Sequence, residues 1–493
     1  MICIPITGLD MNQALADLDK AAELADLFEL RIDMIKDADI PALLSAATKP
    51  CIVTNRTKLE GGEYRGDDAS RIQRLREAID AGADYVDVEV STPRELLQSI
   101  IEGERKNTQV IVSYHDFTKT PDRLEGLYEI MRELPGDNIL KIVTYAQDLN
   151  DNLQMFRLVE RARKEGQKFI GLCMGEKGEI SRILSTLLGG YLTFGSLDRG
   201  KESAPGQITA SRLRDVYRIG SLKEPVELYG VLGNPVSKSM GPWIHNRAFK
   251  ETNRSAIYVP LLADNAEKFF EGFKDRIQGL SVTMPFKENM VPLVSAMEDA
   301  ARPTGALNTL YKKDDQWIGA NTDGVGALQA LEKLTDVSGK RILIIGAGGA
   351  AKAIGHEAVR RGASVTVTFN ANQDRAEKLA NELGGKAIPI RAALNDATDI
   401  LINCSPVGMT PDVETSPVSA RKLNDKIIVF DTVYNPLETR LLRDAKEAGC
   451  KTVTGAEMFL NQAAAQFELW TGESAPFEAM REALMDQLQD KTP

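Results

Sequence analysis

The sequence predicts an α/β protein with an N-terminal (β/α)8 barrel, the TIM-barrel fold, followed by a two-lobed α/β unit whose second lobe is a Rossmann domain. Two observations predict this architecture. Before residue 220, strand-like runs alternate with amphipathic helical stretches, as in a closed barrel of eight parallel strands. Farther along, the apolar run Ile342–Ile345 ends at a glycine-rich turn that passes into a helical pattern, which is typical of a nucleotide-binding βαβ unit.

Length and composition bound the class of protein. A chain of 493 residues is too long for one core and suggests about three domains. The net charge of -11 argues against a nucleic-acid partner, because there is no basic surplus to bind phosphates. The apolar runs are too short to span a membrane. The five cysteines show no metal-binding spacing, so we expect reduced thiols, no metal, and a cytoplasmic protein without a targeting segment.

Eight short runs, mostly apolar and rich in β-branched residues, are expected to form the strands of a barrel at residues 1–220. Amphipathic stretches such as Ala69–Asp80 and Asn152–Lys164 separate most of them. In such barrels the reacting groups lie at the C-terminal ends of the strands. The expected strands are Ile2–Thr7, Phe28–Asp33, Cys51–Arg56, Tyr85–Val90, Val110–His115, Ile139–Tyr145, Phe169–Cys173 and Tyr191–Phe194.

Lys141 is the most informative polar residue of these strands. It lies in the middle of an apolar run, on the same face as Ile139 and Val143. A desolvated lysine has a lowered pKa and can attack a carbonyl as a neutral amine. The alternatives are a lysine paired with a barrel carboxylate, or one whose ammonium reaches solvent. His115 and Glu60 favour the first interpretation, because an imidazole could carry the proton transfers of such a reaction.

Other polar residues at the strand ends would complete this site. Three arginines among them could hold a carboxylate or hydroxyl groups of a substrate. The candidates in the barrel are Glu29, Arg31, Arg56, Glu60, His115, Lys141, Arg182, Ser203 and Gln207.

A short linker at Arg218–Glu227, which contains glycine, serine and proline, separates the barrel from a second α/β region. In that region, hydroxyls, amides, Lys287 and Asp323 follow the strands, and the two charged residues form either an acid–base pair or one more salt bridge. His245 is expected to be a buried, hydrogen-bonded histidine. The expected parts are a substrate-binding lobe at 228–325, a nucleotide-binding lobe at 326–455, and helices that pack back on the substrate lobe at 456–493.

The glycine-rich turn has the spacing G-x-G-x-x-A, in which Ala351 stands at the place of the third glycine. Glycines let the backbone approach a pyrophosphate, and the helix that follows offers it unpaired N–H groups. The second strand, Ser364–Phe369, follows one helix later. The pattern therefore predicts a dinucleotide cofactor rather than a simple tight turn.

The first 220 residues resemble type I 3-dehydroquinate dehydratase. The likeness rests on FELRID at 28–33, TNRTKLEGG at 54–62, SYHDF at 113–117, the lysine of ILKIV, and SAPGQ at 203–207. It implies a barrel that dehydrates 3-dehydroquinate to 3-dehydroshikimate through a lysine imine. Lys141 would form the imine, His115 would be the general acid and base, and Glu60 would orient His115. The resemblance assigns substrate contacts to Glu29, Arg31, Arg56, Arg182, Ser203 and Gln207.

Residues 228 to about 487 resemble shikimate dehydrogenase through the motifs GNPVSKS, VTMPFK, GALNT, NTDG, GAGGA and a helix with Gln462. The resemblance implies that Lys287 and Asp323 are the catalytic dyad. It assigns substrate contacts to Ser237, Ser239, Thr283, Asn308, Tyr434 and Gln462. It assigns cofactor contacts to Gly346, Ala347, Gly348, Gly349, Ala350, Asn370 and Gly455.

Three positions depart from the pattern of this family. Gly241 replaces the second serine of HSxSP, so Gly241→Ser is expected to tighten shikimate binding. Ser281 replaces the asparagine before VT, and Ala371 replaces the arginine of an NRT stretch. No carboxylate ends the second strand, and Arg375 follows closely enough to meet a 2′-phosphate. NADP is therefore the expected cofactor, with a smaller margin over NAD than in relatives that keep the arginine.

Together the two halves predict a fusion that dehydrates 3-dehydroquinate and reduces 3-dehydroshikimate to shikimate with NADPH, consecutive steps of aromatic amino-acid biosynthesis. The expected partners are these small molecules, with no nucleic acid and no membrane; the oligomeric state is open. The alternatives are a catabolic fusion that oxidises quinate or shikimate with NAD, and a non-catalytic metabolite sensor. A sensor would have lost catalytic groups, yet Lys141, His115, Lys287 and Asp323 are all present.

Overall fold

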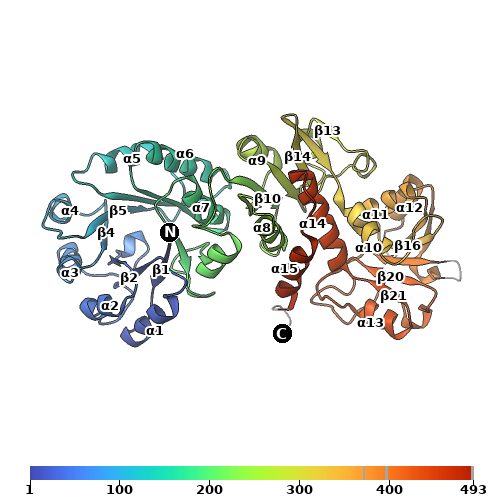
Figure 1. Ribbon diagram of the computed structural model, residues 1–493, viewed down its shortest axis with the longest axis horizontal. Helices are drawn as coiled ribbons and strands as arrows, with labels where there is room; N and C mark the ends of the chain where they lie inside the picture. The colour runs from blue at the N-terminus through green and yellow to red at the C-terminus, as the bar shows by residue number, and fades with distance from the viewer. Residues whose placement is uncertain (370–371, 395–397, 490–493) are drawn as a thin grey trace. The chain divides into compact units, whose positions relative to one another are not determined.

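The computed structural model describes residues 1–369, 372–394 and 398–489 (Figure 1). The chain forms two compact units. The first contains Met1–Val226 together with Val259–Phe273, and the second contains Glu227–Tyr258 and the chain from Lys274 onward.

The first unit is built on a curved sheet of parallel strands with helices around its outside (Figure 1). All eight predicted strands are present, and their ends lie within two residues of the expected positions. The strands are β1 (Ile2–Ile6), β2 (Leu27–Arg31), β3 (Cys51–Thr54), β4 (Tyr85–Glu89), β5 (Gln109–His115), β6 (Ile139–Tyr145), β7 (Phe169–Met174), β8 (Thr193–Ser196) and the short β9 (Ile208–Thr209). The helices are α1 (Met11–Ala21), α2 (Ile40–Ala46), α3 (Asp68–Asp80), α4 (Arg94–Ile101), α5 (Leu124–Arg132), α6 (Asp151–Lys164) and α7 (Glu179–Leu184).

The order of the strands is β7-β6-β5-β4-β3-β2-β1-β8-β9. In the part of the chain that the structure describes, no strand ladder joins β7 to β8, so the sheet is open where a closed ring was expected. A turn at Gly189 and Gly190 precedes β8, which begins at Thr193. The two ends of the sheet still meet, because the N–H of Tyr191 donates to the carbonyl of Phe169 at 2.8 Å.

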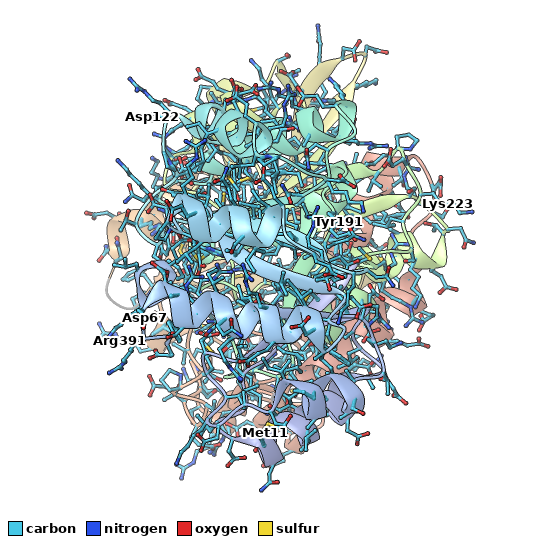
Figure 2. All side chains as sticks on the ribbon, turned by 90° about the vertical axis from the view of Figure 1, so that its left-hand side faces the viewer. Met11, Asp67, Asp122, Tyr191, Lys223 and Arg391 are labelled. Carbon is cyan, nitrogen blue, oxygen red and sulfur yellow. The ribbon has the colours of Figure 1, made fainter. Side chains whose placement is uncertain are left out.

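Apolar side chains fill the inside of the curved sheet. Residues from β1, β2, β3, β5, β6, β7 and β8 form one buried cluster, which includes Ile52, Ile139 and Phe194. At the N-terminal end of the strands, the hydroxyl groups of Tyr85 and Tyr191 lie 2.9 Å apart (Tyr191 is labelled in Figure 2). This end of the barrel is therefore packed, and the polar groups gather at the opposite, C-terminal end, as expected for the fold.

Side chains before the helices fix where several of them begin. The carboxylate of Asp67, labelled in Figure 2, accepts a hydrogen bond from the N–H of Ser70 at 2.8 Å, one turn into α3. Asp10 does the same for α1 through the N–H of Gln13. Such caps satisfy N–H groups that have no partner within the helix.

A sheet built mainly from strands of the second unit has the order β11-β10-β12-β14-β15-β13, and the second half of β11 belongs to the first unit. Its strands β10 and β12 are parallel, and β14 and β15 form an antiparallel hairpin. The strands are β10 (Glu227–Gly233), β11 (Ala256–Leu262), β12 (Gly279–Val282), β13 (Ala296–Met297), β14 (Thr309–Lys313) and β15 (Gln316–Ala320). Helix α8 (Gly241–Glu251) belongs to the second unit, whereas α9 (Ala266–Phe273) lies in the segment Val259–Phe273 of the first unit.

The second sheet of this unit is fully parallel and has the order β18-β17-β16-β19-β20-β21. Numbered from its own first strand, this is 3-2-1-4-5-6, the order of a dinucleotide-binding Rossmann sheet. The strands are β16 (Arg341–Ile345), β17 (Ser364–Phe369), β18 (Lys386–Pro389), β19 (Ile400–Asn403), β20 (Ile428–Asp431) and β21 (Lys451–Val453). The helices are α10 (Thr322–Glu332), α11 (Gly349–Arg360), α12 (Gln373–Glu382), α13 (Arg440–Glu447), α14 (Gly455–Thr471) and α15 (Phe477–Gln489).

Helix α10 packs closely against α14, and this contact positions two predicted site residues. Gly326 makes the close approach possible, since a Cβ at that position would lie 2.5 Å from the backbone nitrogen of Gln462. Asp323 is in the first turn of α10 and Gln462 is on α14. The last helix, α15, packs on α8.

Candidate active sites

The first candidate site is a cavity at the C-terminal end of the barrel strands, where β2, β3, β5 and β6 end. The structure brings all nine barrel residues singled out from the sequence to this cavity. Phe117, Phe194 and Met174 contribute apolar surface between them. The predicted residues in its lining are Glu29, Arg31, Arg56, Glu60, His115, Lys141, Arg182, Ser203 and Gln207.

Lys141 lies on the inner face of β6, and only 4% of it is exposed. Its ammonium lies 3.0 Å from a carboxylate oxygen of Asp87 and 3.5 Å from one of Glu29. The ring of Phe194 lies 4.5 Å from the same nitrogen. The lysine is thus both desolvated and paired with barrel carboxylates, which combines two interpretations that the sequence presented as alternatives.

Arg56 is held in a buried network rather than turned only toward the cavity. Its guanidinium donates to Asp87 at 2.6 Å and to Ser113 at 2.7 Å, and it lies 3.1 Å from Glu89. Burial opposes its charge, but these carboxylates outweigh it and raise the pKa of Arg56. Glu89 also forms an ion pair with the buried Arg71. Arg56 was expected to contact the substrate, and its guanidinium already has three protein partners.

His115 and Glu60 form the expected pair. Nδ1 of His115 lies 3.1 Å from a carboxylate oxygen of Glu60, and the backbone N–H of His115 donates to the same oxygen at 3.0 Å. Ser91 donates to the other oxygen at 2.7 Å. Burial raises the pKa of Glu60 to about 7, while burial, with Arg56 and Lys141, lowers the pKa of His115 well below its usual value. The imidazole is therefore neutral at neutral pH and able to accept a proton.

The other two arginines differ in how they are partnered. Arg31 makes a bidentate ion pair with Asp33, at 3.0 and 2.8 Å. Arg182 is buried and donates through one Nη to the carbonyl of Pro205 at 3.2 Å, whereas its Nε has no partner in the structure. Burial lowers the pKa of Arg182 to about 10. An under-bonded, desolvated guanidinium in a cavity favours an anionic ligand.

Sequence reasoning missed the acids of β4. Asp87 and Glu89 alternate with Val86 and Val88 along that strand, so both acids point into the barrel. The register places Glu89 beside Ser113, and Ser113 beside Lys141. The alternation of acids and valines was the available signal, because a barrel buries both faces of its strands.

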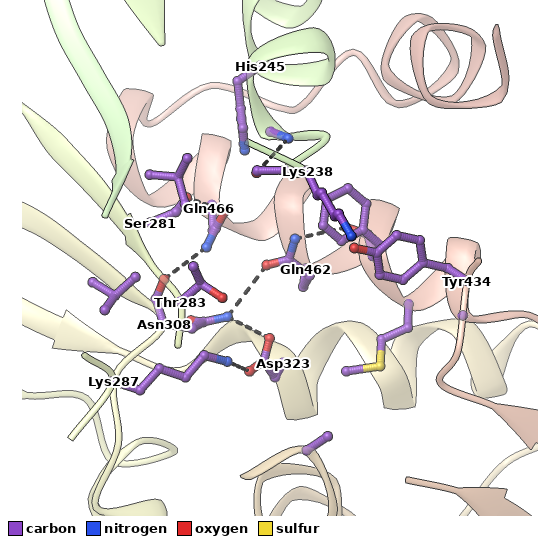
Figure 3. A pocket seen from close by; sticks show the side chains of 18 of the residues that line it. Lys238, His245, Ser281, Thr283, Lys287, Asn308, Asp323, Tyr434, Gln462 and Gln466 are labelled. Carbon is purple, nitrogen blue, oxygen red and sulfur yellow. Dashed lines mark hydrogen bonds and ion pairs between the residues drawn. The ribbon is translucent and has the colours of Figure 1, made fainter. Parts of the chain in front are cut away.

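The second candidate site is a cavity of about 380 Å³ within the second unit, seen from close by in Figure 3. Residues from the first sheet, from the loop after β20 and from α14 surround it. The predicted residues in its lining are Ser239, Thr283, Lys287, Asn308, Asp323, Ala350, Tyr434, Gly455 and Gln462. Ser237 is exposed and does not line it. A tight turn, in which Ser239 N–H donates to the carbonyl of Val236, presents Ser239 inward, so the expected contact from Ser237 is not supported.

Lys287 and Asp323 form an ion pair with 2.5 Å between Nζ and a carboxylate oxygen (Figure 3). The amide of Asn308 donates to the other oxygen of Asp323 at 2.8 Å. Asn308 also lies 3.5 Å from the side-chain oxygen of Gln462. The carboxylate is thus fixed by α10 and by the loop before β14, and it holds the lysine at the edge of the cavity. This arrangement suits a lysine that delivers a proton to a developing alkoxide.

A second chain of hydrogen-bonded polar side chains also lines the cavity. Tyr258 donates to Ser281 at 2.7 Å, and Ser281 donates to the side-chain oxygen of Gln466 at 2.9 Å. Gln466 in turn donates to the carbonyl of Asn308 at 3.1 Å. The serine that replaces the usual asparagine is therefore fully engaged, and Gln466 links the two polar chains.

The backbone of Gly241 is not in the left-handed conformation, so only the available space limits a side chain introduced at this position. A Cβ there would lie 2.8 Å from the ring of Tyr258. A serine at 241 therefore requires the Tyr258 ring to move, and the expected tightening by Gly241→Ser is replaced by an expected weakening. His245 is buried and stacks on Tyr258 with ring centroids 4.5 Å apart. Its side chain is hydrogen-bonded to Gln466, as expected of a buried histidine, and only its Nδ1 has no partner in the structure.

The glycine-rich turn lies at a third cavity, at the C-terminal edge of the parallel sheet. Gly346, Ala347 and Gly348 line it together with Thr368 and Arg375. Gly346 has φ of +103°, which favours glycine. Gly349 begins α11, and a Cβ at Gly348 or Gly349 would meet no other atom within 4 Å. Asn370 and Ala371 lie outside the described residues.

These features fit a dinucleotide. The start of α11 offers N–H groups beside an open glycine turn, which suits a pyrophosphate. The hydroxyl of Thr368 is buried without a partner at the end of β17, where a nucleotide ribose is bound in Rossmann folds. Ala350 and Gly455 line the substrate cavity instead, so the predicted cofactor residues connect the two cavities.

The chain matches four protein families in order along its length. Residues 2–224 match type I 3-dehydroquinase, and residues 231–310 match the shikimate dehydrogenase substrate binding domain. Residues 341–433 match the coenzyme F420-dependent NADP oxidoreductase family, and residues 455–485 match the shikimate 5′-dehydrogenase C-terminal domain. No helix among the described residues is long and apolar enough to cross a membrane.

Relatives with both halves align along nearly the whole chain. The bifunctional 3-dehydroquinate dehydratase/shikimate dehydrogenase, chloroplastic, of Arabidopsis thaliana is 39% identical over 97% of this chain and 83% of its own. The shikimate biosynthesis protein AroDE of Chlamydia pneumoniae is 32% identical over 95% of each chain. Among solved structures, a shikimate dehydrogenase in complex with NADP⁺ is 34% identical, with a TM-score of 0.52, and covers 54% of this chain and 97% of its own.

Proposed function

Because the chain belongs to the family of bifunctional 3-dehydroquinate dehydratase/shikimate dehydrogenases, we propose which of its residues carry each of the two reactions. The chain dehydrates 3-dehydroquinate and reduces 3-dehydroshikimate to shikimate with NADPH, and these are consecutive steps of the shikimate pathway. The division into a barrel at 1–220, lobes at 228–325 and 326–455, and terminal helices at 456–493 is part of the proposal.

In the barrel, the amine of Lys141 attacks the ketone of 3-dehydroquinate, and loss of water gives an imine. His115 removes a proton from the carbon next to the imine carbon. It returns the proton to the hydroxyl that leaves as water, and hydrolysis of the imine frees the amine. Glu60 orients the imidazole. Arg182 is the proposed partner of the substrate carboxylate, because its Nε is buried without a partner.

In the second unit, Lys287 donates a proton to the oxygen of the substrate ketone as it becomes an alkoxide, and Asp323 holds the lysine in place. When bound, NADPH supplies the hydride that reduces the carbonyl carbon. Gln462, Asn308, Thr283, Ser239 and Tyr434 surround the space that a substrate would occupy between Lys287 and α14. The glycine turn, Thr368 and Arg375 are the proposed contacts of the cofactor phosphates and ribose.

The compartment and the partners of the chain are also proposals. All five cysteines are free, and four of them are buried. This agrees with a reducing compartment such as the cytoplasm. The net charge of -11 favours small-molecule partners over nucleic acid.

One observation carries the proposal for the barrel: among the described residues, one buried lysine lines a cavity that is also lined by His115 and three arginines. The experiment is reduction with borohydride in the presence of 3-dehydroquinate, followed by peptide mass spectrometry. We expect a covalent adduct on Lys141 and loss of dehydratase activity. The control is Lys141→Met, in which the surface lysine Lys168 remains; it should stay unlabelled. Full activity without an adduct would exclude the imine.

A further inference from the structure

The substrate cavity of the second unit has two chemically different ends. One end holds the Lys287–Asp323 ion pair, where the ketone is reduced. The other end is formed by Ser239 on the turn before α8, by His245 of α8 with Tyr258 stacked on it, and by Ser281. His245 and Ser281 are labelled in Figure 3. A substrate bound with its ketone at the first end presents its remaining groups to the second.

The substrate carries one charge, its carboxylate. Among the described residues that line this cavity, the charged ones are Lys238, Lys287 and Asp323. Asp323 neutralises Lys287 through their ion pair. Lys238 is exposed, and within the described part of the chain no carboxylate lies within 4 Å of its ammonium. The cavity therefore has one uncompensated positive charge, and it lies on the turn before α8.

The neutral hydroxyl donors at this end are few. Gly241 contributes no hydroxyl, and the ring of Tyr258 occupies the space beside it. The hydroxyl hydrogen of Tyr258 is already directed at Ser281, and that of Ser281 at Gln466. The hydroxyl oxygen of Ser239 accepts from the N–H of Gly241 at 3.2 Å, so its own hydrogen is free to point into the cavity.

Resting on the proposed function of this site, we propose that Lys238 determines specificity for an anionic substrate by pairing with its carboxylate. Ser239 adds one hydrogen bond, and the start of α8 adds favourable partial charge. Figure 3 shows the side chain of Lys238 extending into the cavity on the side of Tyr434. The ion pair replaces the hydroxyl contact that a serine at position 241 would make.

The experiment compares oxidation of shikimate with that of methyl shikimate, an uncharged ester, by the full-length protein with NADP. In Lys238→Met we expect KM for shikimate to rise about five- to tenfold, as for the loss of a partly exposed ion pair. The value of kcat should change less than about threefold. The two constants for methyl shikimate should stay the same. Lys238→Arg keeps the charge and should recover most of the affinity for shikimate. Added salt should raise KM for shikimate in the wild type and in Lys238→Arg, but not in Lys238→Met.

The matched control is Lys250→Met, an exposed lysine at the far end of α8 that does not line the cavity; it should behave as the wild type. An unchanged ratio of kcat/KM for shikimate over methyl shikimate in Lys238→Met would overturn the proposal. A change in KM for NADP alone would also overturn it, since it would assign Lys238 to the cofactor. Failure of the wild type to oxidise shikimate at all would instead contradict the proposed function.

Discussion

The two active sites hold their catalytic lysines in opposite ways. In the barrel, Lys141 is 4% exposed and lies between Asp87 and Glu29, within a network that also holds Arg56. In the second unit, the side chain of Lys287 is 32% exposed and pairs with Asp323 at the edge of an open cavity. Removing one member of a buried network leaves a charge without a partner or solvent, whereas water can replace a partner in an open cavity. Substitutions in the barrel should thus affect folding and rate together, and those in the second unit mainly rate.

The largest expected effect is the loss of one of the two reactions while the other is kept. His115→Ala should slow dehydration by about 10²–10⁴-fold, the usual contribution of a positioned acid–base group. Oxidation of shikimate with NADP should be unchanged, because His115 lies in the other unit. The measurement is steady-state kinetics of both reactions on the same preparation. Equal loss of both activities would mean that the two sites are not independent.

A stability comparison tests the difference in burial. Asp87→Asn should lower the free energy of unfolding of the barrel by about 3–5 kcal/mol, because Lys141 and Arg56 lose the charge of their shared partner. Asp323→Asn should change that of the second unit by less than about 1 kcal/mol. All three tryptophans, Trp243, Trp317 and Trp470, lie in the second unit.

Tryptophan fluorescence therefore reports unfolding of the second unit, and circular dichroism reports both units. Asp87→Asn should shift part of the dichroism transition in urea and leave the fluorescence transition in place. Comparable shifts for the two variants would remove the proposed contrast between a buried network and an open pair.

The pH dependence of the two reactions should differ around pH 7. Burial raises the pKa of Glu60 to about 7, and His115 titrates well below its usual range. We expect kcat/KM for dehydration to bend near pH 7, an apparent value that belongs to the coupled pair. Glu60→Gln should remove this bend. The same bend in the variant would assign it to another group.

Glu60 also gives a stability difference of defined sign. Its folded pKa is raised from about 4.5 to about 7, so the folded state holds the proton more tightly than the unfolded state. Its contribution to stability is fully present below pH 4.5 and is lost as the pH rises through 7. The stability of Glu60→Gln relative to wild type should therefore increase between pH 5 and pH 8 in urea titrations. A decrease over this range would contradict the assigned shift.

The smallest expected effect concerns the cofactor. Arg375 lines the nucleotide cavity and is the cation proposed for the 2′-phosphate. Arg375→Ala should lower the ratio of kcat/KM for NADP over NAD by about three- to tenfold, as for one exposed charge-assisted contact. Ala371→Arg should raise the ratio. A ratio that does not respond to either change would place the selecting group elsewhere.

Most of the architecture was predictable from local pattern. The strands of the barrel and of the Rossmann sheet are short apolar runs between amphipathic helices, and both sheets follow from that alternation. The lack of a strand ladder between β7 and β8 was not predictable, because it depends on pairing between separate segments of the chain. Pairing between distant segments of the sheet is not encoded in local periodicity.

The site residues likewise divide into those that local pattern reveals and those that depend on contacts between distant segments. Those at strand ends, such as Arg31 and His115, could be found because strand ends converge at one edge of a sheet. The alternation of acids and valines on β4 could have pointed to Asp87, but its partners Arg56 and Lys141 come from distant parts of the chain, and no spacing in the sequence reports them. Ser237 lies outside the lining of the cavity, because one tight turn decides which of two nearby serines faces inward. The restriction at Gly241 likewise comes from Tyr258, a residue of another element.

The central claim is that two separate sites on one chain perform consecutive reactions, and one measurement tests it directly. Lys141→Met and Lys287→Met are each incubated with 3-dehydroquinate and NADPH, first singly and then as an equal mixture, and the product is identified. Neither variant alone should form shikimate, because each lacks one reaction. The mixture should form shikimate, because Lys287→Met releases 3-dehydroshikimate and Lys141→Met reduces it. Shikimate from either variant alone, or none from a mixture of folded proteins, would contradict the account.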